Sequence, residues 1–160
     1  MLRTLSTRAI RQPAIRAFRR GYAEAAPASD KIRVSLALPR ATLYENFDAT
    51  QVNIPTTAGD LGILADHVPT IQQLRPGVIE VINGSTTEKY FVSGGFATVN
   101  EGSALNINAV DAHPVEDFSP EAIRTLTTEA QNKAASSDEA TAAEGKIELE
   151  VLEALAAVAK

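Results

Sequence analysis

The chain changes composition abruptly at Ser119, and this change limits the possible fold more than any other feature. From Lys31 to about His113, short apolar segments alternate with turn residues. From Ser119 onward, Ala and Glu dominate, and only one proline and one glycine occur. Turn residues at short intervals are typical of all-β domains, and their absence favours helices. The sequence therefore predicts a β domain followed by a helical unit.

Two patterns predict strands in residues 31–114. Apolar and polar residues alternate in 32–38 and again within 48–54, as in strands with one buried face. Asn83-Gly84 and Asn100-Glu101-Gly102 each separate two apolar segments, which is typical of hairpins. Many short strands with frequent turns favour a sandwich or a barrel, and we expect an antiparallel β-sandwich.

The last 42 residues, 119–160, carry two helix start signals. Ser119 can cap a helix whose first residue is Pro120, and Ser136 with Glu139 has the spacing of a capping box. Two helices joined by a few residues form an antiparallel two-helix hairpin. Its apolar side is rich in Ala and buries little area, so the hairpin needs the sandwich or a partner to pack against.

The N-terminus has the composition of a mitochondrial transit peptide, which we place at residues 1–22. It is rich in arginine and has no acidic residue before Glu24. We expect cleavage between Tyr22 and Ala23, and a flexible tail over 23–30. A basic arm for nucleic acid or membranes is the alternative. The arginines are Arg3, Arg8, Arg11, Arg16, Arg19 and Arg20.

The rest of the chain is strongly acidic. Six of the fifteen Lys and Arg lie in 1–22, which leaves nine against twenty Asp and Glu, a net charge of −11. Such a body repels phosphates, so nucleic-acid binding is excluded. No apolar segment approaches 18 residues, so no membrane span is expected. Cysteine is absent, which excludes disulfides, thiolate catalysis and zinc–thiolate sites.

Two groups of residues are candidates for chemistry. His67 follows Asp66, but neighbours on an extended chain point apart and no nucleophile or second His lies nearby, so we interpret His67 as structural or as part of an interface. Asp111, His113, Glu116 and Asp117 resemble a metal cluster, but no further His or Cys completes a coordination set. We expect no metal here.

Gly94-Gly95 is not expected to bind phosphate. No Lys-Ser or Lys-Thr pair follows it and no helix begins there, so a bulge or a sharp strand bend is favoured. No catalytic constellation is visible in the sequence. We therefore expect a non-catalytic protein without a cofactor, and a matrix enzyme or small-ligand sandwich is the weaker alternative.

Two segments resemble one protein family. Gly59–Gly77, GDLGILADHVPTIQQLRPG, and Lys89–Val99, KYFVSGGFATV, are similar to segments of the family that comprises the mitochondrial delta subunit of F-type ATP synthase and its bacterial and chloroplast epsilon counterparts. The order of transit peptide, sandwich and hairpin is also that of the mitochondrial members, and the resemblance covers about residues 31–160.

The resemblance implies a rotor component of the central stalk. Such a subunit fixes the gamma subunit to the membrane c-ring, so that proton-driven rotation reaches the catalytic head where other subunits make ATP. The implied partners are gamma, the small mitochondrial epsilon subunit and the c-ring. The implied location is the matrix side of the mitochondrial inner membrane, as a peripheral part of the complex.

The resemblance also assigns residues. Asp60, Leu61 and Gly62 match a family loop that faces the c-ring, and His67 matches a histidine at the same end. We expect Gly59 and Gly62 to shape this segment as a tight loop. The hairpin would pack on the sandwich, on gamma or on the small subunit through Ile123, Leu126, Ile147, Val151 and Leu155.

A nucleotide-sensing regulator of the bacterial epsilon type is the alternative function. Bacterial relatives that bind ATP carry an Ile-Asp-x-x-Arg-Ala segment at the first helix, whereas residues 119–126 here are SPEAIRTL. Residues 119–160 hold four basic and eight acidic side chains, a net charge of −4. The resemblance implies that an inhibitory hairpin engages acidic segments of the catalytic subunits, and like charges oppose that contact. We expect a hairpin that stays folded down and does not sense ATP.

Overall fold

The computed structural model describes residues 30–159. The predicted transit peptide 1–22, its cleavage position between Tyr22 and Ala23, and all but the last residue of the predicted tail 23–30 lie outside the described residues. The described elements are the strands β1 Ile32–Ala37, β2 Thr42–Ala49, β3 Gln51–Thr56, β4 Gly59–Leu64, β5 Thr70–Leu74, β6 Gly77–Asn83, β7 Thr86–Val92, β8 Gly95–Asn100, β9 Ala104–Ala109 and β10 Ala112–Pro114, the 3₁₀ turn η1 Val115–Asp117, and the helices α1 Pro120–Ala134 and α2 Glu139–Val158.

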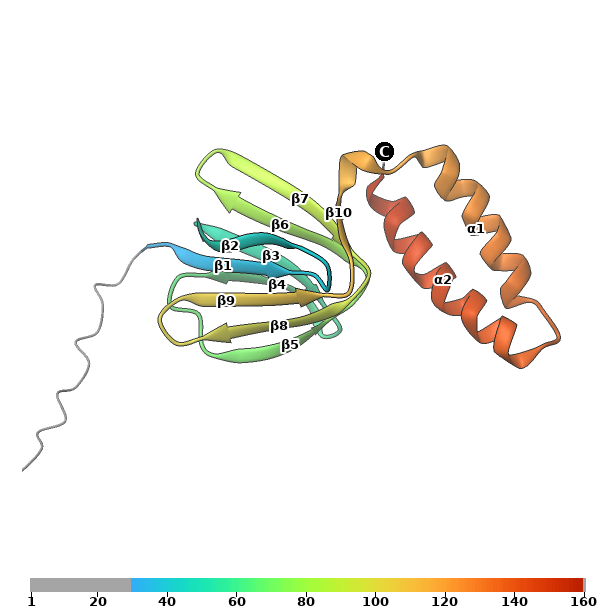
Figure 1. Ribbon diagram of the computed structural model, residues 1–160, viewed down its shortest axis with the longest axis horizontal. Helices are drawn as coiled ribbons and strands as arrows, with labels where there is room; N and C mark the ends of the chain where they lie inside the picture. Colours follow the sequence, from blue (N-terminus) through green and yellow to red (C-terminus); the bar gives the residue numbers. More distant parts are fainter. Residues whose placement is uncertain (1–29, 160) are drawn as a thin grey trace, which may run out of the picture.

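The strands form one curled sheet that folds over into two layers (Figure 1). The hydrogen-bonded order is β10-β7-β6-β3-β5-β8-β9-β1-β2, and β4 pairs with β3. A single residue pair, Thr56 with Leu74, joins β3 to β5. The sheet therefore bends at this pair, with β4-β3-β6-β7-β10 in one layer and β5-β8-β9-β1-β2 in the other.

The inner faces of the two layers enclose one apolar core. The alternation seen in the sequence decides which residues enter it, because successive side chains of a strand point to opposite faces. Each large aliphatic side chain that is fully buried contributes about 1.5–3 kcal/mol relative to exposure. The largest of these are Ile32, Leu36, Ile54, Ile63, Ile79, Leu105, Ile107, Val34, Val52 and Val92.

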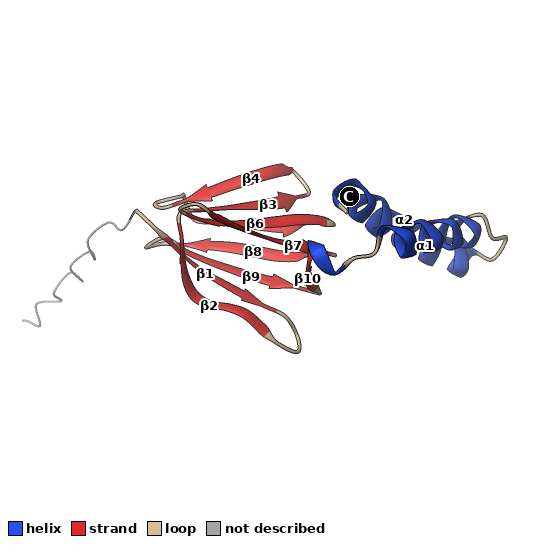
Figure 2. Ribbon diagram, turned by 90° about the horizontal axis from the view of Figure 1, so that it is seen from above, coloured by secondary structure: helices blue, strands red, loops and turns tan. Residues whose placement is uncertain are grey.

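The hairpin stands at one end of the sandwich (Figures 1 and 2). Its two antiparallel helices extend away from the strands, and the hairpin contacts the sandwich only near its base. A second apolar cluster forms this contact, with Phe91, Ile123 and Leu155 buried at its centre. The predicted class, a β-sandwich followed by an antiparallel two-helix hairpin, is confirmed.

Several local predictions need correction. The sandwich is not wholly antiparallel, because β1 pairs with β9 in parallel. Residues 48–54 are not one strand, because β2 ends at Ala49 and the chain crosses between layers at Thr50. The tight loop predicted from Gly59 and Gly62 is the edge strand β4, and the turn precedes it at residues 57–58. Glycine permits an extended backbone as well as a tight turn, and pairing with β3 selects the extended one at Gly59 and Gly62.

The helix caps also differ from the prediction. Pro120 is the first residue of α1, as expected, but the Ser119 side chain makes no capping hydrogen bond. The second helix is capped by Asp138, whose carboxylate accepts from the backbone nitrogen of Thr141 at 3.0 Å. The predicted Ser136–Glu139 capping box is therefore wrong. Asp138 lies closer to the helix than Ser136 and caps it instead. The hydrogen bonds from Thr141 lower the pKa of the Asp138 carboxyl.

The predicted bend at Gly94-Gly95 is confirmed. It carries the chain from β7 in one layer to β8 in the other, with φ of 152° and 143°. A side chain at Gly95 would place its Cβ 2.2 Å from the Asn108 carbonyl oxygen. Only glycine fits this close approach.

Tyr44 joins the two layers across the sandwich, between β2 and β7. Its hydroxyl donates to the Glu88 carboxylate and lies 3.3 Å from the Tyr90 hydroxyl, and the Tyr44 and Tyr90 rings meet edge to face at 5.7 Å. Burial, followed by the hydrogen bond to Glu88, raises the pKa of Tyr44. The folded state therefore favours the protonated phenol.

Replacing Tyr44 tests this contact. We expect Tyr44→Phe to lower the free energy of unfolding by about 1–2 kcal/mol at neutral pH, because one hydrogen bond to a carboxylate is lost. Since the folded-state pKa is raised, the Tyr44 contribution is complete below about pH 10 and is lost as the pH rises further. Urea unfolding of wild type and variant between pH 8 and pH 11 measures both effects. Tyr90→Phe is the comparison, because the Tyr90 hydroxyl donates to the same Glu88 carboxylate at 3.2 Å from a more exposed position and should contribute less. An equal loss there would contradict a special role for Tyr44.

Gly145 lets the two helices of the hairpin approach closely. It is buried, and a Cβ there would lie 2.4 Å from the Ala134 nitrogen and 2.8 Å from the Lys133 carbonyl carbon. The Lys133 ammonium donates to the Glu148 carboxylate at 2.9 Å across the same crossing. Backbone atoms cannot move aside as flexible side chains do, so the crossing excludes any larger residue.

Gly145→Ala is therefore expected to destabilise the hairpin. In an open helix this change would stabilise by about 1 kcal/mol, whereas overpacking costs about 1–3 kcal/mol. Thermal unfolding followed by far-UV circular dichroism would show a lower transition temperature. Ala143→Gly, at an exposed position of the same helix, is the control for helix propensity alone. A more stable Gly145→Ala protein would contradict the close crossing.

Candidate functional site

The residues predicted to face a partner lie along β4 and in the loop after it. Asp60 is near the hairpin end of β4 and is exposed, and Gly62 is exposed in the middle of the strand. His67 follows β4 at the opposite end of the sandwich, so the expectation that it shares one end with Asp60 is wrong. The Leu61 side chain points inward and packs against the core. Successive side chains of a strand point to opposite faces, so Leu61 faces the core while Asp60 and Gly62 face outward.

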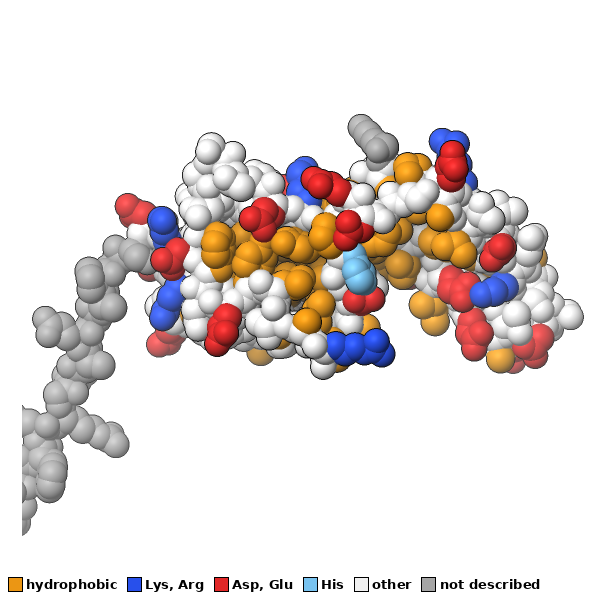
Figure 3. Space-filling model, turned by 45° about the horizontal axis from the view of Figure 1, so that its top comes forward, with side chains coloured by type: hydrophobic (Ala, Val, Ile, Leu, Met, Phe, Trp, Pro, Cys, Tyr) orange, Lys and Arg blue, Asp and Glu red, His pale blue; other side chains and the backbone are white. Residues whose placement is uncertain are grey.

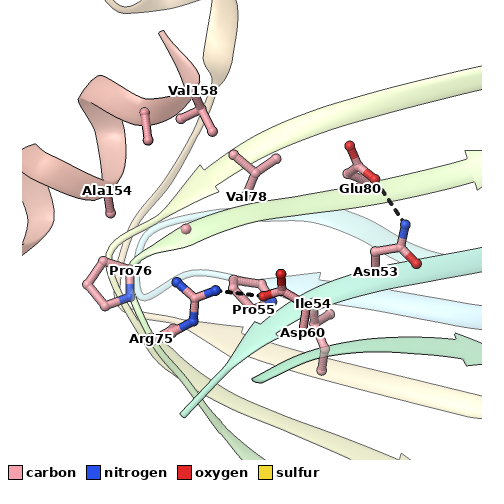
Figure 4. Close-up of a pocket in the computed structure, with 12 residues that line it drawn as sticks. Asn53, Ile54, Pro55, Asp60, Arg75, Pro76, Val78, Glu80, Ala154 and Val158 are labelled. Carbon is pink, nitrogen blue, oxygen red and sulfur yellow. Dashed lines mark hydrogen bonds and ion pairs between the residues drawn. The ribbon is translucent and has the colours of Figure 1, made fainter. Parts of the chain in front are cut away.

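Asp60 has a partner within the chain. Its carboxylate accepts from the Arg75 guanidinium at 2.7 Å, and both side chains are exposed (Figure 4). The pair lies at one side of a cavity of about 460 Å³ between the sandwich and the end of α2. Ala154 and Val158 of α2 face Pro76 and Val78 across it. An exposed pair of this kind contributes at most about 1 kcal/mol to stability.

A polar ladder crosses the outer face beside this cavity. The Lys89 ammonium lies 2.7 Å from the Glu80 carboxylate, which also accepts from the Asn53 amide at 2.9 Å. Asn53 in turn accepts from the Gln51 amide at 2.7 Å. The bond to Lys89, and then the bond to Asn53, lowers the pKa of Glu80. Adjacent strands place these side chains in register, so the ladder is fixed before any partner binds.

His67 is half-buried and does not approach a reactive group. Its Nδ1 lies 2.9 Å from the Val68 carbonyl oxygen, whereas the Asp66 side chain bonds to Ser103. The two neighbours therefore point apart, as the sequence predicted. The arrangement offers no general base with an oriented partner.

The second candidate for chemistry, around His113, is a local pair. His113 Nε2 lies 3.1 Å from the Asp111 carboxylate, and its ring stands at 90° to the Phe118 ring. Within residues 30–159, no three His, Asp or Glu side chains are grouped as they would be to hold a metal ion. The same residues contain no helix that is both long and apolar enough to span a membrane.

The hairpin residues divide into two sets. Ile123 and Leu155 are buried in the cluster around Phe91, and Val151 packs against that cluster. Leu126 is 48% exposed and Ile147 is 66% exposed. The sequence predicted that these residues pack on the sandwich, on gamma or on the small subunit. Because α1 and α2 touch the sandwich only at their base, Leu126 and Ile147 lie beyond that contact.

Two apolar hollows adjoin these exposed side chains. One, of about 590 Å³, lies between the hairpin end of the sandwich and α2, and its lining includes Phe96, Val110 and Ile147. The other, of about 390 Å³, lies on the hairpin and includes Leu126, Ile147 and Leu152. Phe96 is 56% exposed and Val110 is 67% exposed. Large side chains exposed this way mark contact surfaces.

Acidic side chains gather on the hairpin beside the second hollow, whose lining holds Glu129 and Glu148 with Lys133. In Figure 3, hydrophobic side chains gather in a band over the sandwich that continues toward the hairpin, and Asp and Glu side chains gather on the hairpin. Interfaces commonly have an apolar centre with a charged rim. The arrangement therefore has the chemistry of a protein-binding surface.

Comparison with known proteins agrees with this interpretation. Residues 31–114 match the family described as ATP synthase, Delta/Epsilon chain, beta-sandwich domain, and residues 118–157 match the fungal epsilon subunit of F1F0-ATP synthase C-terminal domain. The chain belongs to the ATP synthase delta/epsilon family. Its family resemblance, inferred from two short segments, is thereby confirmed over the sandwich and the hairpin.

Members of this delta/epsilon family are similar over nearly their whole length. "ATP synthase subunit delta, mitochondrial" of Yarrowia lipolytica is 63% identical over 151 residues, which cover 93% of this chain and 92% of that protein. The Saccharomyces cerevisiae protein of the same name is 51% identical over 142 residues, 89% of each.

Two solved structures share the family fold. A chain in the cryo-EM structure of Euglena gracilis mitochondrial ATP synthase, OSCP/F1/c-ring in rotational state 1, has 34% identity and a TM-score of 0.76, covering 91% of this chain and 89% of that one. A chain of the Tetrahymena thermophila central stalk/c-ring has a TM-score of 0.64 over 81% of this chain and 97% of that one. At 18% identity it shows the fold alone.

Sequence reasoning missed Arg75, Tyr44 and Gly145. Arg75 precedes a Pro-Gly turn, but nothing in the sequence pairs it with Asp60, fifteen positions earlier. Tyr44 bonds to residues more than forty positions away. Only Gly145 had a usable signal, since it is the one glycine in an otherwise Ala-rich helical region.

The two hairpin sets are expected to respond differently to substitution. Ile123→Ala should lower the free energy of unfolding by about 2–4 kcal/mol, because it leaves a cavity beside Phe91 and Leu155. Ile147→Asp should change it by less than about 0.5 kcal/mol, since the side chain is exposed in the isolated chain. Chemical unfolding of the two purified variants measures this. A large loss in Ile147→Asp would show that the chain itself covers this residue.

Proposed function

We propose that this chain is the delta subunit of the mitochondrial ATP synthase, a non-catalytic part of the central-stalk rotor. It fixes gamma to the c-ring and carries proton-driven rotation to the subunits that make ATP. The observation that carries the proposal is the similarity over about nine-tenths of the chain to mitochondrial delta subunits. The likeness to a chain of the Euglena gracilis complex supports the same role.

The exposed apolar side chains support membership of an assembly. Phe96, Val110, Leu126 and Ile147 leave hydrophobic area in water, which partner subunits would cover. Gamma and the small mitochondrial epsilon subunit are the partners we assign to the two hollows described above. Both hollows share Ile147, so the two surfaces adjoin and one partner can influence how the other binds.

The c-ring contact is assigned to the outer side of β4. Asp60 and Gly62 are exposed along this edge strand, and His67 follows where the strand ends. Leu61 is not a direct contact in this proposal, because its side chain faces the core. A ring of identical subunits meets one copy of this chain, so a few adaptable polar contacts suit the mismatch in symmetry better than one large complementary patch.

The proposed location is the matrix side of the mitochondrial inner membrane, as a peripheral part of the complex. The arginine-rich, acid-free composition of residues 1–22 supports import into the matrix. The nucleotide-sensing alternative is less favourable. The cationic side chain beside the cavity at the end of α2, Arg75, is already paired with Asp60, whose negative charge opposes phosphate.

The function is tested in mitochondria that carry variants as the sole copy of the chain. The wild-type chain should migrate with the ATP synthase in native electrophoresis, and a chain that migrates alone would contradict the proposal. Asp60→Lys should weaken association with the ring and lower the ratio of protons pumped to ATP hydrolysed. Because the broken pair is exposed, its effect on folding should stay below about 1 kcal/mol.

Arg75 supplies the control for Asp60. Arg75→Glu breaks the same ion pair but leaves the Asp60 carboxylate in place, so coupling should be retained. Asp60→Lys with Arg75→Glu restores an ion pair of reversed polarity but not the acidic contact, so coupling should remain low. If the double variant couples normally, Asp60 acts only through Arg75 and the assigned ring contact is wrong.

A further inference from the structure

Two residues far apart in sequence meet at the end of the sandwich away from the hairpin. Ser103 lies in the turn between β8 and β9, and Asp66 lies in the loop of residues 65–69 between β4 and β5. The Ser103 Oγ accepts from the Asp66 backbone nitrogen at 2.8 Å and donates to the Asp66 carboxylate at 3.3 Å. These two hydrogen bonds connect the two layers of the sandwich, and we call them the Ser103–Asp66 clamp.

Both residues adopt a backbone conformation that disfavours side chains. Asp66 has φ of 58° and Ser103 has φ of 56°, in the left-handed region that glycine adopts without steric strain. Ser103 directly follows Gly102, which is also left-handed. If position 103 only had to form the turn, glycine would adopt the left-handed backbone there with less strain than serine. The serine side chain therefore has a function that offsets the backbone strain.

Ser103 is itself held firmly. It is only 6% exposed, and its carbonyl oxygen accepts from the Arg33 backbone nitrogen at 2.8 Å. The Arg33 guanidinium also donates to the Gly102 carbonyl oxygen at 3.3 Å. The turn is thus attached to β1, so the Ser103 hydroxyl is a fixed point to which the 65–69 loop can be tied.

The loop that the clamp holds is exposed at its tip. Val68 is 69% exposed, and the adjoining Pro69 is also exposed. Inside the loop, the His67 nitrogen donates to the Leu64 carbonyl oxygen at 3.3 Å, which closes a turn. A loop with such a tip needs an external attachment to keep one conformation, because ordering a flexible backbone costs conformational entropy.

We infer that the Ser103–Asp66 clamp pre-orders the 65–69 loop for contact with the c-ring, and that Ser103 is a positioning residue for that contact. The inference rests on the proposed function, which places His67 in the contact with the c-ring. Because of the clamp, the loop loses its conformational entropy when the chain folds rather than when the partner binds. His67 and Val68 are therefore already in position for the contact. Preorganised loops bind more tightly for this reason.

Two substitutions of Ser103 separate positioning from stability. Ser103→Ala removes the hydroxyl and keeps the strained backbone, whereas Ser103→Gly removes the hydroxyl and relieves the strain. The two variants should therefore differ in thermal stability, with glycine the more stable. Both lack the clamp, and in both the amide hydrogens of Asp66 and His67 in the purified chain should exchange about fivefold to tenfold faster than in wild type.

Both variants should also weaken the contact in the assembled complex to a similar extent. The measure is the fraction of ATP hydrolysis that remains coupled to proton pumping as the salt concentration rises. Asp66→Asn is the conservative control, since asparagine tolerates the left-handed backbone and keeps the oxygen that accepts from Ser103. It should exchange and couple as wild type. Asp66→Ala keeps the backbone bond to Ser103 and loses only the carboxylate bond, so its effect should lie between wild type and the Ser103 variants.

Three results would overturn the inference: unchanged exchange in both Ser103 variants, unchanged coupling in both, or a loss of coupling that follows thermal stability, with alanine impaired and glycine normal. Val68→Asp separates this failure from that of the assigned contact. If Val68→Asp impairs coupling and the Ser103 variants do not, only the positioning role is wrong. If Val68→Asp also couples normally, the contact assigned to this loop is wrong.

Discussion

The closing of one curled sheet over a single apolar core determines where every exposed surface of this protein lies. One residue pair joins β3 to β5, and there the sheet bends so that the inner faces of its two halves meet. Among the described strands β4 pairs with β3 alone and is therefore an exposed edge, and the chain reversals gather at two opposite ends. One end receives the hairpin, and the other carries the 65–69 loop. The core is continuous, so these surfaces keep fixed positions relative to one another.

The hairpin depends on this sandwich for its position, but less for its own integrity. Its helices cross closely at Gly145, and the Lys133–Glu148 pair bridges them. The contact with the sandwich is a small cluster around Phe91 at the hairpin base. Most of the hairpin is thus left uncovered, and the side chains beyond the base are available to partners. A compact subunit that bridges gamma and the c-ring, as proposed above, would gain from such an arrangement, because each surface serves one neighbour.

Hydrogen bonds between distant residues supplement the core at the margins of the sandwich. Tyr44 joins β2 to Glu88 and Tyr90 on β7, and Ser103 joins the β8–β9 turn to Asp66. Apolar packing has no direction, so it cannot by itself fix the orientation of a loop or an edge. Hydrogen bonds supply that direction. A subunit that transmits torque needs such fixed edges, because internal motion of the subunit would reduce the torque that reaches its partner.

The sequence by itself determined the two-part architecture, the hairpin turns, the bend at Gly94-Gly95 and the family, because these depend on local patterns of polarity and backbone freedom. It could not show that β1 joins β9 in parallel, that β4 is a strand, or that Asp60 and His67 lie at opposite ends of the sandwich. Asp138 displaced the predicted cap Ser136 for a similar reason, since two competing caps differ only in the geometry that the folded chain gives them. The pairing of Asp60 with Arg75, and of Asp66 with Ser103, was decided by tertiary structure alone. Contacts between residues far apart in the chain depend on how the layers stack, and no local pattern encodes that stacking.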